Sequence, residues 1–259
     1  MISELTEELS RLEIEKCTGV LFVGDGAFQL TDGAITSADC LRTSSLARLV
    51  LEAGVATDED WRRAEAGDAD RLLSRPRLET LALLSVFDAA YLLLGSPSIP
   101  EFRPAPPHWL VAVCRIPPHV LVRECARRGD PDSPPWPARL VDRAPVAPVR
   151  RGPRRRVVLT GGQAEVLAAA DARRSVTGIG EYLGRTTYGC LVAVRELTAA
   201  GLIEPPAPVA TTEPLPRLAE PVEPVRRRRV RQATPVPAPD RWKPDADLLV
   251  RLRAALEDA

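Results

Sequence analysis

The chain has 259 residues, of which 45% are hydrophobic and 27% charged, and its formal net charge is zero. This length is typical of two small domains, and the apolar fraction excludes a wholly disordered chain. The longest apolar run, from Leu81 to Leu94, is interrupted by Asp88 and is too short to cross a bilayer. The N-terminus is acidic and lacks the basic segment that opens a signal peptide. The sequence therefore predicts a cytoplasmic protein without a membrane segment.

Prolines and charges are distributed unevenly along the chain. The 26 prolines crowd within residues 97–153 and again within 205–244, as is typical of linkers. Residues 1–128 carry 14 positive and 19 negative side chains, whereas residues 150–203 carry nine positive and four negative ones. The acidic half indicates a protein partner, and the basic segment indicates an anion.

Cysteine and arginine usage indicates the cellular setting. The five cysteines form no C-x-x-C pair, and one would be left over if the others paired, which favours reduced thiols over disulfides or a zinc framework. Arginine outnumbers lysine by 33 to two, a bias typical of GC-rich genomes such as those of actinobacteria.

No group of residues is typical of an enzyme. Gly24 and Gly26 fall in a predicted hairpin, whereas a dinucleotide site needs its glycines between a strand and a helix. The two histidines, His108 and His119, have no ligand spacing with the cysteines. We predict no catalytic activity, no cofactor and no metal.

Residue patterns in the first half of the chain predict helices around a small antiparallel meander. A helical face spans residues 2–16, and short strands are expected at Gly19–Val23, Ala27–Thr31 and Ala34–Ala38, with glycine-containing turns between them. Further helices are expected at about 44–53, 58–66, 70–94 and 118–128, with a short strand near 101–103. Thr57 is expected to cap the helix at 58–66, because three acidic residues follow it.

Three motifs in this half resemble the N-terminal domain of PatA-like bacterial regulators. They are Thr18-Gly19-Val20-Leu21, the Asp32-Gly33-Ala34-Ile35 turn and the closing segment 121–128. The resemblance covers about residues 1–130. It implies an interaction or sensory module, often found near small-GTPase signalling components.

The second half predicts three short helices in sequence. After an apolar strand candidate at 157–159, Thr160 and Gln163 fit a capping box that opens a helix to about residue 171. Ser175 is expected to cap a second helix, Gly184 to make a short turn, and residues 186–200 to form a third helix. Leu202 and Ile203 would begin the first strand of a wing.

The stretch from Ser175 to Ile203, with its closing Glu-Leu-Thr-Ala-Ala-Gly-Leu-Ile, resembles MarR-type winged helix-turn-helix regulators. The chain continues into Glu204-Pro205-Pro206, so the wing is truncated or absent. We therefore expect a PatA-like α+β domain at 1–129, a proline- and arginine-rich linker at 130–153, a mainly α winged helix-turn-helix domain at 154–204, a disordered proline-rich linker at 205–244 and an amphipathic helix at 245–259.

The first functional interpretation is a transcriptional regulator controlled by its N-terminal domain. The winged helix would bind double-stranded DNA, as a homodimer because one such module buries little surface. Phosphates and bases would be contacted by Arg154, Arg155, Arg156, Arg185, Thr186, Thr187, Tyr188 and Arg195.

The second interpretation is an adaptor that does not bind DNA. Only two basic residues lie on or next to the third predicted helix, which is few for strong DNA affinity. In a bacterial small-GTPase-type signalling system, a signalling protein would then contact the N-terminal domain or the C-terminal helix, where Leu248, Leu249, Leu252 and Leu256 would bind it.

Overall fold

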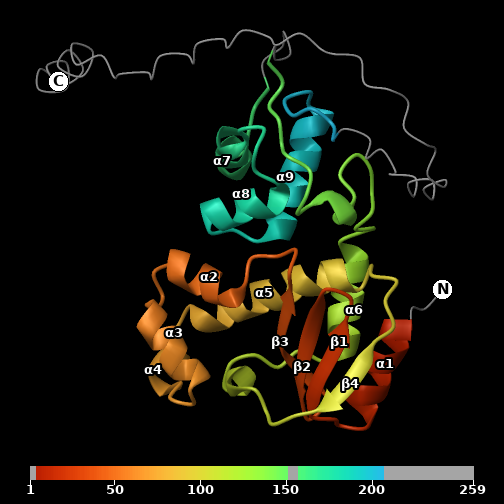
Figure 1. Cartoon of the computed structure of the whole chain (residues 1–259), viewed down its shortest axis with the longest axis vertical. Coiled ribbons are helices and arrows are strands. Elements are labelled where there is room, and N and C mark those ends of the chain that lie inside the picture. The colour runs from red at the N-terminus through yellow and green to blue at the C-terminus, as the bar shows by residue number, and fades with distance from the viewer. Residues whose placement is uncertain (1–3, 151–156, 207–259) are drawn as a thin grey trace, which may run out of the picture. The chain divides into compact units, whose positions relative to one another are not determined.

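Four strands from the first half of the chain form an antiparallel sheet in the order β3-β2-β1-β4 (Figure 1). The strands are β1 (Gly19–Val23), β2 (Gly26–Thr31), β3 (Ala34–Cys40) and β4 (Glu101–Pro104), so the predicted meander and the short fourth strand are confirmed. This computed structural model describes residues 4–150 and 157–206. These residues belong to one compact unit that extends from Met1 to Val209.

The first half also contains the expected helices, with one correction. The helices are α1 (Glu4–Ile14), α2 (Leu46–Glu52), α3 (Asp58–Glu65), α4 (Asp70–Leu73), α5 (Leu78–Leu93) and α6 (Pro118–Arg127), with a 3-10 turn, η1, at Trp109–Ala112. Thr57 caps α3 in a full capping box with Asp60. The predicted single helix at 70–94 is wrong: it is divided into α4 and α5 around Pro76, because the residue before a proline disfavours the helical conformation.

Helix α5 is the central element of the core. It is apolar on almost every side, and ten of its 16 residues are buried, which is typical of a helix covered on all sides. It packs on β3 and also contacts α2, α6 and α9. The other face of the sheet is less covered: Val20 and Gln29 are partly exposed and Phe22 is exposed. In Figure 1, α5 and α6 lie behind the sheet.

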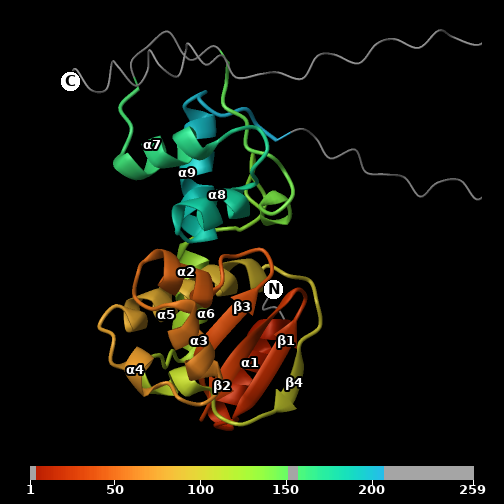
Figure 2. The ribbon, with the colours of Figure 1, turned by 60° about the vertical axis from the view of Figure 1, so that its left-hand side comes forward.

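The three helices predicted in the second half are α7 (Gly161–Ala169), α8 (Val176–Leu183) and α9 (Thr187–Ala199), which Figure 2 shows grouped together. Thr160 and Gln163 form the expected capping box. Gly184 has a φ of 61° at the end of α8, the left-handed conformation that favours glycine in the turn before α9.

Two strand predictions here are wrong. Residues 157–159 form no strand, since Val158 is 95% exposed and has no neighbouring strand to pair with. Ile203 makes only an isolated bridge to Pro148, so no wing strand starts there within residues 157–206.

Residues 130–150 do not behave as the extended linker that their prolines predicted. They include a second 3-10 turn, η2 (Ala138–Leu140), and they bury Trp136, Val141 and Val146 completely. These side chains belong to the same core cluster as those of α5 and α9. Apolar residues between the prolines therefore fold this segment onto the helices and join the two predicted domains.

Several predicted features lie outside the described residues. They are Arg154, Arg155 and Arg156, the linker from residue 207 to 244, and the C-terminal helix with Leu248, Leu249, Leu252 and Leu256. In the part of the chain that the structure describes, no helix has the length and apolar character needed to span a membrane.

Candidate functional site

The first turn of α9, where the DNA-reading residues were predicted, is bonded to α5. The Asp88 carboxylate accepts hydrogen bonds from the backbone amides of Thr187 and Tyr188, at 2.8 and 2.6 Å. The first amides of a helix have no partner within the helix, and they carry its positive dipole end. A carboxylate from another element therefore occupies the position that a phosphate would take at this end of α9.

The surroundings of Asp88 are apolar and aromatic. Asp88 is 1% exposed and Thr187 is fully buried. The Tyr188 ring packs edge-on against Tyr91 of α5, and the Arg128 guanidinium lies 4.6 Å from the Tyr188 ring centre. Burial raises the pKa of Asp88 to about 6, although the two amides and the charge of Arg128 act in the opposite direction.

Arg195 is also turned inward. Its guanidinium donates to the backbone carbonyls of Trp136 and Pro131, the shortest of these at 2.6 Å, and to the hydroxyl of Tyr91 at 3.2 Å. The Trp136 indole donates in turn to the Thr198 hydroxyl at 3.0 Å. Arg195 therefore ties α9 to α5 and to the segment at 130–150, and four of its five N–H donors are already in use.

The remaining predicted DNA contacts at this end of α9 are Arg185 and Thr186. Arg185 forms an ion pair with Glu165 of α7 at 2.6 Å. The Thr186 hydroxyl caps α9 by accepting from the amide of Gly189. The structure thus brings residues 185–188 together at one helix end, but Arg195 is directed elsewhere and Thr187 is inaccessible.

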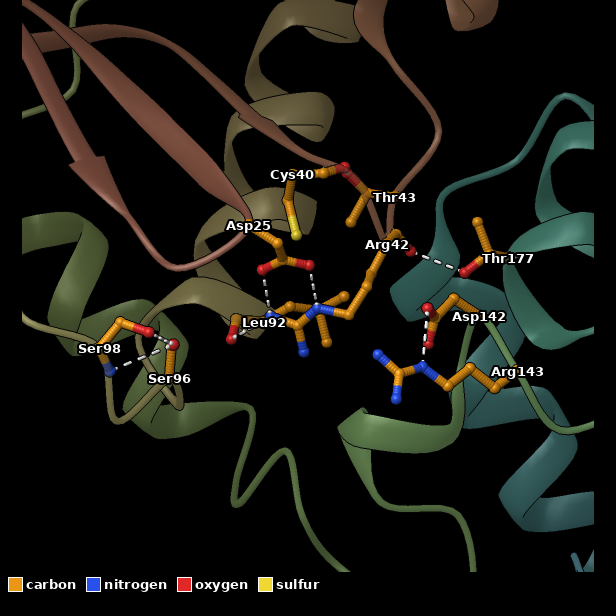
Figure 3. A network of polar contacts seen from close by, with 10 residues as sticks. All are labelled: Asp25, Cys40, Arg42, Thr43, Leu92, Ser96, Ser98, Asp142, Arg143 and Thr177. Carbon is orange, nitrogen blue, oxygen red and sulfur yellow. Dashed lines mark hydrogen bonds and ion pairs between the residues drawn. The ribbon is translucent and has the colours of Figure 1, made fainter.

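A second polar site lies at the β1–β2 turn (Figure 3). Asp25 and Arg42 form a bidentate ion pair with distances of 2.6 and 2.9 Å, and Arg42 also donates to the carbonyl of Leu92. The carbonyl of Arg42 accepts from the Thr177 hydroxyl of α8 at 2.7 Å. Although burial opposes it, the Arg42 guanidinium lowers the pKa of Asp25.

Cys40 lies beside this ion pair but is not a reactive thiol. Burial raises the pKa of Cys40 to about 11, so the thiol is neutral at pH 7. In the described part of the chain, no three histidine, cysteine or acidic side chains are grouped as a metal site. His119 instead contacts Glu13 at 2.6 Å, and His108 accepts from the amide of Leu110.

A groove of about 760 Å³ opens next to the ion pair. Its walls come from β1, the β1–β2 turn, the start of β2, the end of β3, the loop that leads to α2, α2 itself and α8. They include Phe22, Leu41, Asp39, Arg48 and Glu181. The groove combines exposed apolar side chains with carboxylates.

Sequence reasoning missed both Asp88 and the groove. Asp88 did stand out, because it interrupts the apolar run from Leu81 to Leu94. A charge in a fully buried helix needs a partner, and this was the available signal. No protein-family model, curated protein or solved structure matches this chain.

Proposed function

We propose that this chain is a non-enzymatic cytoplasmic adaptor that binds other proteins, with the helices α7 to α9 acting as a structural support. One observation carries the proposal: the amides at the start of α9 are bonded to Asp88 of α5. A recognition helix reads DNA with its N-terminal residues in the major groove. Here the amides of Thr187 and Tyr188 are already bonded and the Thr187 side chain is buried, so the first turn of α9 cannot offer them to a groove unless it leaves α5.

The charges on α9 support the same function. Phosphate contacts need cationic side chains that are free to approach DNA. Arg185 is paired with Glu165, and Arg195 is bonded to backbone carbonyls. The exposed residues on α9 are Gly189, Glu196 and Ala199, none of which is basic.

A DNA-binding regulator is the second candidate. The observation that favours it is the order of α8, the turn at Gly184 and α9, which is the order of a helix-turn-helix. In that case DNA would have to replace Asp88 as the partner of the Thr187 and Tyr188 amides, and Arg154, Arg155 and Arg156 would contact phosphates.

Fluorescence anisotropy of the full chain with labelled duplex DNA at several salt concentrations distinguishes the two candidates. For an adaptor, we expect any binding to be independent of DNA sequence and to keep its salt dependence in the Arg185→Ala variant. A phosphate contact by Arg185 would instead reduce the salt slope by about one. Sequence-preferring binding that is lost in Arg185→Ala, together with faster amide exchange at Thr187 and Tyr188, would overturn the proposal.

A further inference from the structure

The groove at the β1–β2 turn has two exposed apolar side chains, of which Phe22 also has the Arg103 guanidinium 5.1 Å from its ring centre. Leu41 is 85% exposed and Phe22 is 41% exposed, and both line the groove. The Leu41 backbone is fixed, because its amide donates to the Asp25 carbonyl at 3.1 Å. Its side chain therefore projects from an anchored backbone into water, where an apolar surface gains free energy when a partner covers it.

The strand register extends this surface across the sheet. Phe22 of β1 pairs with Ala27 of β2, and Ala27 pairs with Asp39 of β3. Directly paired residues point to the same face of a sheet. Phe22 and Asp39 therefore lie on one row of the same face, with the small side chain of Ala27 between them.

The charge of the groove is negative. Asp25 is neutralised by Arg42, and Arg48 pairs with Glu52 at 3.0 Å. Asp39 and Glu181 form no ion pair with any residue in the described ranges 4–150 and 157–206. Two carboxylates without a cation thus accompany the exposed apolar groups.

We propose that this groove binds a segment of a partner protein in which arginine or lysine alternates with large apolar residues. Cationic side chains would pair with Asp39 and Glu181, and an apolar side chain would cover Leu41 and Phe22. The same carboxylates repel nucleic acids and other anions. This inference rests on the adaptor function proposed above and names the chemistry of its partner.

The test is an NMR titration of the ¹⁵N-labelled full chain with a synthetic nonapeptide of alternating arginine and leucine. Two reference peptides replace every arginine by glutamate or every leucine by serine. We expect the first peptide to shift amide signals of residues 22–27, 39–45 and 181, with a Kd that rises with salt. Neither reference peptide should bind with comparable affinity.

Single substitutions in the groove test which residues contact the peptide. Leu41→Ser should raise the Kd about tenfold, because it removes an apolar contact that would be buried in the complex. Asp39→Asn and Glu181→Gln should each raise it about twofold to fivefold, as is typical of exposed ion pairs. The control is Ile14→Ser, at a side chain that is 80% exposed at the end of α1 and lies outside the groove, and it should leave the Kd unchanged.

Absence of binding, or equal binding of the glutamate peptide, would overturn this inference. Binding with shifts elsewhere and no effect of Leu41→Ser would also overturn it, while leaving the adaptor function intact. A parallel titration with duplex DNA distinguishes failure of this inference from failure of the proposed adaptor function. Shifts confined to the amides of residues 185–189 on adding DNA would contradict the adaptor function itself.

Discussion

Replacing Asp88 with asparagine tests whether burial or hydrogen bonding controls the carboxylate at the start of α9. The substitution keeps the shape of the side chain and removes its ionisation. In the wild-type protein, burial raises the pKa of Asp88 from 3.8 to about 6. The folded protein therefore holds this proton more tightly than the unfolded chain does. The contribution of Asp88 to stability is then greatest below about pH 3.8 and is lost as the pH rises through about 6.

These two pKa values give the expected change in the free energy of unfolding. As the pH falls from 7, the wild-type protein should gain stability relative to Asp88→Asn by about 1.3 kcal/mol at pH 5 and about 2.4 kcal/mol at pH 4. The change with pH of the stability difference between the two proteins reports the ionisation of Asp88. Its value at a single pH also contains the hydrogen bond that asparagine cannot accept.

The assay is urea unfolding of both proteins at several pH values between 4 and 7, followed by circular dichroism. Asp68→Asn serves as the control, because it removes a carboxylate from an exposed loop and should shift the free energy of unfolding by no more than about 0.5 kcal/mol between pH 5 and 7. The reasoning would be refuted if the free energy of unfolding of wild type relative to Asp88→Asn stays constant or decreases as the pH falls. Asp88 would then be an ionised cap, with a pKa kept low by the two amides.

Four further substitutions test individual contacts by urea unfolding at pH 7. Arg195→Lys should lower the free energy of unfolding by about 2 kcal/mol, because an ammonium group cannot reach all the acceptors of the guanidinium; a loss below about 0.5 kcal/mol would contradict this. Gly26→Ala should cost about 3 kcal/mol, because a Cβ would lie 2.1 Å from the carbonyl oxygen of Asp39. Gly161→Ala, which meets nothing within 4 Å, should be neutral or stabilising, and equal losses at both glycines would argue against the steric cause. Thr187→Val should stabilise by about 0.5 kcal/mol, because the buried hydroxyl has no partner among the described residues; destabilisation would indicate that it has one.

Local signals in the sequence predicted most elements of the fold. Thr57, Thr160 and Ser175 each begin a helix as expected, because an N-cap depends only on the residues that follow it. The glycines at the turns likewise allowed the positions of the three meander strands to be predicted. The break between α4 and α5 was also readable from Pro76, but the continuous apolar pattern around it outweighed that signal.

Contacts between distant residues could not be predicted in the same way. The prolines of 130–150 indicated a linker, yet Trp136 is buried in the core, and Arg195, almost 60 residues later, donates to its carbonyl. The site residues on α9 were chosen by their position in the helix, and that position is the correct one for a helix-turn-helix. Asp88, a hundred residues earlier, decides what they contact.

The loop between β3 and α2 connects the two sites. Its Ser44 hydroxyl donates to the carbonyl of Arg185 at 3.2 Å, and the carbonyl of Arg42 accepts from Thr177. The same loop carries Leu41 into the groove, and α8 supplies Glu181 to the opposite wall. The groove therefore includes Glu181 only while α8 stays bonded to this loop, and α8 packs in turn on α9, whose first amides are bonded to Asp88. In the proposed adaptor, the bonds from Asp88 to α9 would therefore act twice: they would keep the start of α9 from DNA, and they would hold in place the surface on which we expect a protein partner to bind.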